Sequence, residues 1–270
     1  MKCGTTSLRY YLRAHPDIFM ARGGLNFFIE EGNWHRGVEW YAAQFRAATI
    51  RGDTSPRYAN FPLARAVPER MHAQVPDAKL LYIIRDPIER LVSHYCHAYA
   101  AGEEDRTLAQ ALHDLDDRPE ANPYVCRGLY FLQIEQFLRC YPRQQILVCY
   151  HEDLRDRRLP TLQRIFRFLG VDDSFVSPEF ERISHRTADK RRLGRTGRLL
   201  QQSGAMRVLG PTAPRLQRAL EGIITNAFGR GVPRPQLLPE LRDKLSAIFR
   251  PDMRRLGDFV GGDPPRWPLG

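Results

Sequence analysis

Cysteine is scarce in this chain of 270 residues, and none of its five cysteines forms a C-x-x-C pair. Their odd number and scattered positions argue against a disulfide framework and a zinc site, so we predict a protein of the reducing cytoplasm. Long hydrophobic runs are also lacking, since no apolar stretch reaches the roughly 18 residues of a membrane span. The N-terminus does not read as a signal peptide, because basic residues interrupt its apolar positions.

One basic segment lacks aromatic residues and is poor in acidic ones. Residues 182–218 hold ten Lys or Arg residues and a single acid, Asp189, within a chain of formal net charge +10. Such a stretch attracts phosphate or sulfate groups. Without Phe, Tyr or Trp it offers no ring on which a nucleic-acid base can stack, so we predict no nucleic-acid partner. The segment is therefore interpreted either as an anion site or as a solvated basic surface. Within it, residues 184–214 are predicted to form a basic loop or cover.

Apolar patterning predicts strands that alternate with helices. The continuous runs 79–84 and 145–150 are typical of strands buried on both faces of a parallel sheet, and 49–56 is expected to hold a short strand that ends in a polar turn. Together these patterns predict one α/β domain over residues 1–270, with a mostly parallel sheet and an irregular tail at 260–270. Helices are expected from the opening residues to near Pro16, after Asp86, and over 128–140, 159–169 and 237–249.

The opening stretch KCGTTSL combines a lysine, a glycine and three hydroxyl residues directly before a helix. Gly4 permits a tight turn, and the N–H groups that begin the helix can point at an anion. The classical G-x-x-x-x-G-K-[ST] nucleotide loop is absent, because there is one glycine and the lysine precedes it. Two interpretations of this stretch therefore remain, an anion site and an ordinary helix start.

A second candidate follows the apolar run 79–84. Arg85 stands where that strand is expected to end, and ligands of open α/β sheets bind at the carboxyl ends of strands. On the helix that follows, Arg90, Ser93 and His97 lie opposite an apolar stripe at about 100° per residue. Arg85 with Ser93 would suit a second phosphate, although the polar face could also be exposed to water.

Together, KCGTTSL and IIRDPIERLVSHY resemble the sulfotransferases that use 3′-phosphoadenosine 5′-phosphosulfate (PAPS). The resemblance covers roughly residues 1–175 in the right order. It implies a P-loop-like three-layer α/β/α fold that moves a sulfuryl group to a hydroxyl or amine of a carbohydrate or other polar metabolite, leaving the bisphosphate PAP. Further stretches similar to the heparan-sulfate-type and bacterial carbohydrate branch are FFIEEGNWHRGVEWYAAQF, GDTSPRY, RGLYFLQIEQFLRCYPRQQILVCYHEDL and LQRIFRFLGV.

The same resemblance implies roles for individual residues. In this family the first loop holds the 5′-phosphosulfate, which points to Lys2, Cys3, Gly4, Thr5, Thr6 and Ser7. The arginine and serine of the second motif hold the 3′-phosphate, which points to Arg85 and Ser93. Lys2 would neutralise the bridging or leaving oxygen, and no metal is expected because lysine and arginine supply the positive charge. Residues expected near or over the nucleotide are Tyr130, Lys190, Arg191 and Arg192.

One departure concerns the catalytic base. The branch carries Lys-Glu-x-His before FF, with the glutamate as base, but here Gly23, Gly24 and Asn26 take those places and Thr54 replaces a frequent lysine. Glycine cannot accept a proton, so another group acts as base or catalysis has been lost. His97 is our candidate, with an ordinary helix histidine as the alternative. Further candidates close to FF are Glu30, Glu31 and His35.

Other expectations concern the chain start and the rival functions. The family loop normally follows an apolar strand, so we expect the natural chain to begin upstream of Met1. A P-loop small-molecule kinase, which would bind Mg-ATP, and a PAP- or PAPS-binding relative without catalysis both stay open. The sequence indicates neither the acceptor nor the oligomeric state. The residues expected to serve packing are Trp34, Trp40, Tyr41 and Phe45.

Overall fold

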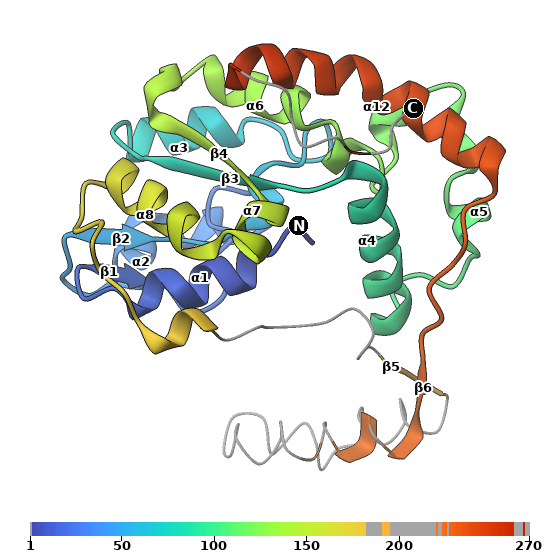
Figure 1. The fold of residues 1–270 in the computed structure, drawn as a ribbon, viewed down its shortest axis with the longest axis horizontal. Coiled ribbons are helices and arrows are strands. Elements are labelled where there is room, and N and C mark those ends of the chain that lie inside the picture. Colours follow the sequence, from blue (N-terminus) through green and yellow to red (C-terminus); the bar gives the residue numbers. More distant parts are fainter. Residues whose placement is uncertain are drawn as a thin grey trace. The chain divides into compact units, whose positions relative to one another are not determined.

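The computed structural model describes residues 2–181, 191–194, 220, 223–225, 227–261 and 267. Lys190 and most of the segment 184–214 lie outside these residues. The chain divides into two compact units (Figure 1). The first unit comprises Met1–Leu91, Asp114–Ser184 and Leu238–Gly270, and the second comprises Val92–His113 and His185–Leu237. That the whole chain forms one domain stays a prediction.

Parallel strand pairs form the sheets of the first unit. Strand β1 (Ile18–Met20) pairs with β2 (Ile50–Gly52), and β3 (Leu80–Ile84) pairs with β4 (Ile146–Tyr150). The α/β class with parallel strands is therefore confirmed. These four strands are divided between two sheets of two strands each.

Helices cover both faces of the β3–β4 sheet (Figure 1). Leu81 and Ile83 face a core shared with α1 (Thr5–Ala14) and α8 (Arg158–Leu169). Because successive strand side chains point to opposite faces, Leu80 faces another core. That core includes residues of α3 (Val67–Gln74) and α6 (Tyr130–Leu138). Burial on both faces explains why the strand sequence is continuously apolar.

The predicted helices are present, and helix α4 (Pro87–Ala101) begins after the expected aspartate. Helix α8 ends at Gly170 with φ of 82°, a left-handed conformation that glycine adopts at little cost. Short helices were not expected, because one or two turns carry too little periodicity to stand out. They are α2 (Gly37–Ala42), α5 (Leu108–Ala111) and α7 (His151–Asp156).

Helix α12 (Pro239–Val260) is longer than expected. The predicted end near residue 249 is wrong, because Pro251 lies inside the helix. A proline removes one backbone hydrogen bond, yet buried residues continue on both sides of it, including Phe249 and Met253. Burial along this face keeps the helix continuous. Turns of 3₁₀ helix occur at Trp34–Arg36, Pro56–Tyr58, His113–Leu115, Pro119–Ala121, Cys126–Gly128, Arg143–Gln145 and Pro178–Glu181.

An aromatic cluster in the first unit surrounds Phe27 and Phe28, which are 0% and 1% exposed. The Phe27 ring stacks on Tyr41 with 4.6 Å between centroids. The expected packing role is therefore confirmed for the four residues that line this cluster, Trp34, Trp40, Tyr41 and Phe45.

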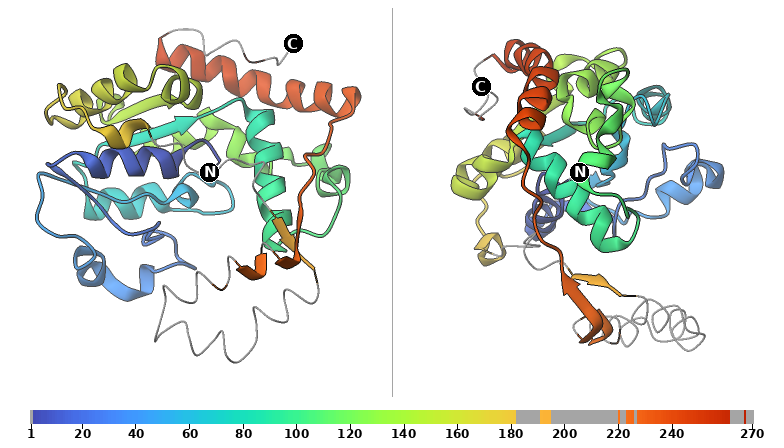
Figure 2. Two further views of the ribbon diagram at one scale, coloured as in Figure 1. Left: turned by 60° about the horizontal axis from the view of Figure 1, so that its bottom comes forward. Right: turned by 90° about the vertical axis from the view of Figure 1, so that its right-hand side faces the viewer.

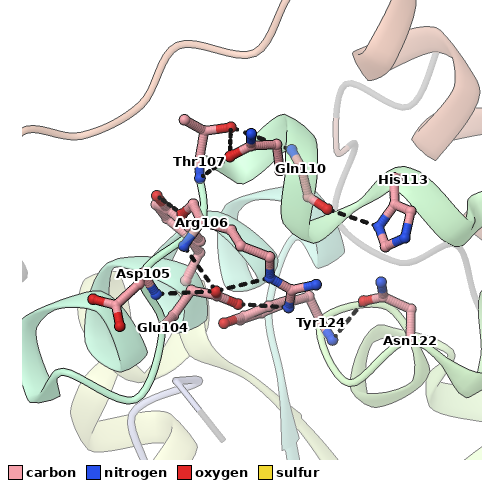
Figure 3. A network of polar contacts seen from close by, with 9 residues as sticks. Glu104, Asp105, Arg106, Thr107, Gln110, His113, Asn122 and Tyr124 are labelled. Carbon is pink, nitrogen blue, oxygen red and sulfur yellow. Dashed lines mark hydrogen bonds and ion pairs between the residues drawn. The ribbon is translucent and has the colours of Figure 1, made fainter.

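The second unit contains the later part of α4, α5, and an antiparallel pair formed by β5 (Arg191–Leu193) and β6 (Gly229–Gly231). Figure 3 shows the polar contacts that precede α5. The Glu104 carboxylate accepts hydrogen bonds from the Arg106 side chain at 3.0 and 2.9 Å. Thr107 and Gln110 form a reciprocal capping box that fixes the start of α5.

Candidate functional site

Residues 2–7, called the anion loop here after their predicted role, lead into the first turn of α1. Gly4 is the N-cap residue with φ of 91°, and Lys2 has φ of 65°, so the backbone turns sharply twice. No side chain of the described residues caps this helix, and its first turn holds no acidic residue. The N–H groups that begin a helix have no carbonyl partner within the helix. The loop therefore has the backbone geometry of an anion-binding turn.

His151 lies against this loop from the end of β4. A Cβ atom added at Gly4 would sit 2.8 Å from the His151 Nδ1 atom, so the imidazole occupies the space that any side chain would need. Nδ1 is buried and has no hydrogen-bond partner among the described residues. Burial and the neighbouring Arg85 cation lower the pKa of His151 to about 4, so the ring is neutral at pH 7.

Tyr130 brings the anion loop to the end of β3. Its hydroxyl donates a hydrogen bond to the Arg85 carbonyl at 2.7 Å and accepts one from the Arg85 N–H at 3.4 Å. The same oxygen lies 3.9 Å from the Cys3 sulfur. Cys3 and Arg85, which are 82 residues apart in sequence, are thus joined through one phenol. Because the ring is only 1% exposed, Tyr130 acts on the site through Arg85 and Cys3.

Arg85 is the cation at this edge of the sheet. Its guanidinium forms an ion pair with Glu89 at 3.3 Å, and its side chain is 21% exposed. Arg85 and His151 each follow the last paired residues of their strands, Ile84 and Tyr150. The carboxyl ends of β3 and β4 therefore present an arginine and a neutral histidine beside the anion loop.

The polar face of α4 is not fully exposed to water, which was one of the two interpretations of the sequence. Arg90 and Ser93 are 0% and 1% exposed, and the Arg90 guanidinium donates to the Tyr124 carbonyl, so a uniformly wet face is wrong. His97 is exposed. Ser93 and His97 belong to the second unit, whereas Arg85 and Arg90 belong to the first.

The late-chain cations lie in the second unit where they are described. Arg192 forms an ion pair with Asp105 and stacks over the Tyr99 ring at 3.9 Å. Arg191 is exposed at the start of β5. Both partners of the Arg192 guanidinium thus belong to the same unit as Arg192. That Arg191 and Arg192 cover the nucleotide stays a prediction. The expected role of Lys190 concerns a residue outside the described part.

A hydrogen-bonded cluster formed by Asp53, Ser55 and Tyr58 holds the backbone at the stretch where the family resemblance would place the base. Asp53 accepts from the Leu25 N–H at 3.1 Å, and Ser55 Oγ accepts from the Asn26 N–H at 2.9 Å. The next N–H group, of Phe27, donates to the Tyr58 hydroxyl at 3.0 Å. Tyr58 in turn donates to Asp53 at 2.6 Å. This role was not predicted for the stretch GDTSPRY. The available signal is its short polar side chains so close to a strand.

Gly24 has no room for a side chain in this backbone. An added Cβ would lie 2.6 Å from the Thr54 carbonyl oxygen, whereas at Gly23 it would meet nothing within 4 Å. Asp53 is a half-buried carboxyl next to this stretch, and partial burial raises its pKa although hydrogen bonds from Tyr58 and from the Leu25 N–H oppose that shift. The other sequence candidates, Glu30, Glu31 and His35, are exposed.

Three general features bear on the site. Among the residues that the structure describes, no group of three or more His, Cys, Asp or Glu side chains could hold a metal ion. Within the same ranges, no helix combines the length and the apolar composition needed to cross a membrane. None of the five cysteines is joined in a disulfide bond.

Comparison with protein families matches residues 1–196 to the family described as "Sulfotransferase domain". Among curated proteins, human heparan sulfate glucosamine 3-O-sulfotransferase 6 is 26% identical over 267 residues, which cover 97% of this chain and 70% of that protein. Mouse heparan sulfate glucosamine 3-O-sulfotransferase 3B1 is 29% identical over 185 residues, covering 66% of this chain and 46% of the relative. The human bifunctional heparan sulfate N-deacetylase/N-sulfotransferase 2 is 26% identical over 185 residues, or 63% and 21% of the two chains.

A solved structure has the same fold. The sulfotransferase from Alicyclobacillus acidocaldarius superimposes with a TM-score of 0.68 at 23% identity, covering 98% of this chain and 94% of the other. This likeness supports the α/β P-loop-like architecture that the resemblance implied.

Proposed function

This chain belongs to the sulfotransferase domain family, and from that premise we propose that it transfers a sulfuryl group from PAPS to a carbohydrate. The observation that carries the proposal is the pairing of an anion loop with a cationic strand end. Cys3 of the loop and the backbone of Arg85 meet at one hydroxyl, that of Tyr130. A nucleotide with phosphates at two ribose positions needs two such groups of donors near each other.

The described residues fit the 5′ end of PAPS by their donor chemistry. Gly4 has a positive φ of 91°, a backbone conformation that glycine adopts at little cost in a tight anion-binding turn. The N–H groups of Thr5, Thr6 and Ser7 would hold the 5′ anion, and Lys2 would add a full charge beside them. Arg85 with Ser93 would hold the 3′-phosphate. We propose no metal in this arrangement.

Sulfuryl transfer demands little covalent chemistry from the protein. Like phosphoryl transfer, it needs in-line positioning and compensation of the charge that develops on the leaving oxygen. Lys2 and the backbone N–H groups would provide that compensation. PAPS supplies the activated sulfuryl group when bound. A base must take the acceptor's proton, and His97 is the residue we propose for this role.

The proposed acceptor is a hydroxyl or amine of a sugar chain. The names of the relatives specify transfer to oxygen in glucosamine 3-O-sulfotransferases and to nitrogen in the N-sulfotransferase. The chain spans about half or less of several of these relatives, including 46% and 21% in two cases. Acceptor choice is therefore proposed at the level of carbohydrates.

A thermal-shift comparison tests the cofactor class. PAP without metal should raise the melting temperature, and Mg-ATP should leave it close to that of the protein in buffer. A shift with Mg-ATP alone would favour the kinase alternative, which the family match does not support. No shift with PAP, with micromolar binding also absent by calorimetry, would refute the proposal.

Transfer itself is tested with radiolabelled PAPS and desulfated heparan oligosaccharides. The wild type should label the acceptor, and His97→Ala should lower kcat by about 100-fold or more with an unchanged affinity for PAP. Binding of PAP with no transfer to any acceptor would favour the non-catalytic alternative. Equal kcat values for the two proteins would exclude His97 as the base.

The cellular location follows from a separate argument. We propose that the protein works in the cytoplasm, because scattered free cysteines suit a reducing compartment. Fractionation of the source cells, followed by immunodetection, checks this; recovery from an oxidising compartment would contradict it.

A further inference from the structure

Helix α6 begins without a cap of its own. Its N-cap residue is Leu129, whose side chain makes no capping hydrogen bond. Instead Asp252 of α12 accepts hydrogen bonds from the Phe131 N–H at 2.9 Å and the Leu132 N–H at 2.8 Å. A carboxylate in this position satisfies donors that a helix start leaves unpaired and complements the positive end of its dipole.

Burial of the Asp252 carboxyl group is energetically unfavourable. It is 8% exposed, and burial raises its pKa to about 6 although backbone hydrogen bonds from α6 and the charge of Arg255 act in the opposite direction. A buried carboxyl group lowers stability unless its contacts compensate. Its contacts are the N–H groups of the first turn of α6, the turn that starts with Tyr130.

Tyr130 connects this cap to the candidate site. It is the first residue of α6, and its hydroxyl binds both backbone groups of Arg85 and lies near the Cys3 sulfur. A shift in the first turn of α6 would move that hydroxyl away from these partners. The cap comes from a helix outside residues 1–196, which are the residues matched to the family.

We propose that Asp252 is a positioning residue for the cofactor site, because it fixes the first turn of α6 and thereby holds Tyr130 against Arg85 and Cys3. This inference rests on the proposed function for its effect on nucleotide binding. Its structural part concerns Tyr130 and Cys3 alone and can be measured without any ligand.

Other contacts keep α6 attached to α12 when the cap is removed. Helix α12 runs along α6 in every view (Figures 1 and 2). Arg255 forms an ion pair with Glu135 and stacks over the Phe131 ring at 4.3 Å. An Asp252 variant therefore loses the cap while the pair of helices remains packed. Arg255→Gln is the matched control, since it removes an ion pair between the same helices and leaves the cap in place.

The first experiment measures the position of Tyr130 through Cys3, whose side chain is 1% exposed. Alkylation of each cysteine is followed by mass spectrometry, with Cys149, also 1% exposed, as internal reference. Asp252→Ala should speed the labelling of Cys3 by about tenfold and leave Cys149 unchanged. Asp252→Asn, which retains one acceptor oxygen, should restore most of the protection, and Arg255→Gln should label like the wild type. Equal acceleration at both cysteines, or none at Cys3, would overturn the inference.

The second experiment measures PAP affinity by calorimetry well below the melting temperature. Asp252→Ala should bind PAP about fivefold to tenfold more weakly, and Arg255→Gln within twofold of the wild type. In a Tyr130→Phe background the same Asp252→Ala change should have less than a twofold effect, because the hydroxyl through which it acts is gone. Independent, multiplying effects would overturn the inference. A wild type that does not bind PAP would refute the proposed function, and the Cys3 labelling would still decide the structural part.

Discussion

Two glycine-containing turns of the first unit use their backbone donors differently. In the anion loop, Gly4 begins α1 and no described side chain caps the helix. In the stretch after Gly23 and Gly24, three successive N–H groups, of Leu25, Asn26 and Phe27, already donate to the Asp53, Ser55 and Tyr58 side chains.

The difference separates a candidate ligand site from a structural turn. A turn can bind an anion only through donors that the protein has not already engaged. The anion loop is held in place by contacts from distant elements, namely His151 and Tyr130, and these contacts leave the helix start without a side-chain cap. The second turn is held through its own donors, so we expect it to serve as a rigid structural turn.

Gly4→Ala should have the largest effect. The new Cβ would meet His151 at 2.8 Å, and φ of 91° is unfavourable for alanine. Strain and overpacking together should lower the free energy of unfolding by about 2–5 kcal/mol and weaken PAP binding by at least tenfold. Urea unfolding and calorimetry measure the two quantities. Gly37→Ala is the control, because Gly37 has φ of 79° and open space, so it isolates backbone strain from the clash. Equal losses at the two sites would show that His151 does not matter.

Asp53→Ala should lower the stability of the fold and leave the affinity for PAP nearly unchanged. Removing the carboxylate leaves the Leu25 N–H and the Tyr58 hydroxyl without their acceptor in a partly buried setting. The free energy of unfolding should fall by about 2–4 kcal/mol, while PAP affinity at low temperature changes less than twofold. Asp77→Ala, at an exposed position, controls for loss of one charge. A large loss of PAP affinity would mean that the second turn belongs to the binding site.

Gly24→Glu tests whether a glutamate base can be restored at the position where the family resemblance places one. Because the Cβ would lie 2.6 Å from the Thr54 carbonyl oxygen, the substitution should cost about 1–3 kcal/mol of stability and bring no gain in transfer. Gly23→Glu, which has open space but a positive φ, should cost about 1 kcal/mol. Transfer assays and urea unfolding of both variants make the comparison. A stable and more active Gly24→Glu protein would show that the backbone adapts.

His151 should give the smallest effect, seen only through pH. Its pKa is lowered to about 4 in the folded protein, against about 6.5 in the unfolded chain. The unfolded chain therefore binds more protons between these values, so the stability due to this group is full above pH 6.5 and is lost as pH falls toward 4. The change should be about 1–2 kcal/mol after allowance for partial exposure.

The pH effect is read from urea unfolding of the wild type and His151→Gln between pH 4 and 7. The difference between the two proteins removes the opposite contribution of groups such as Asp252, whose raised pKa makes stability fall as pH rises through the same range. His35→Gln, at an exposed position, should follow the wild-type curve. A pH-independent difference would mean that His151 titrates normally.

Much of the fold was readable from local signals. The apolar runs of β3 and β4, the aspartate and proline before α4, and the glycine after α8 each act through neighbours in sequence, and each predicted element is present. The end of α12 was not readable, because Pro251 normally stops a helix and only burial against the rest of the first unit keeps this one continuous.

The candidate site divides in the same way. The loop and Arg85 carry their own signals in glycine, lysine and position after a strand, and the resemblance to sulfotransferases joined them. His151 and Asp252 gave no signal, because their importance lies in contacts with Gly4 and α6 across more than 100 residues. The burial of Arg90 and Ser93 was likewise decided by packing, which helix periodicity does not reveal.

By itself the sequence determined the family, the parallel strands and the chemistry of the two candidate anion-binding stretches, since these depend on residue type and short spacing. Only the tertiary structure decided which glycine turn has its N–H groups engaged by side chains, which histidine lies beside the loop and which carboxylate holds α6. Those outcomes depend on side chains that meet through packing between distant segments, and the burial and hydrogen bonding that result are properties of the folded chain.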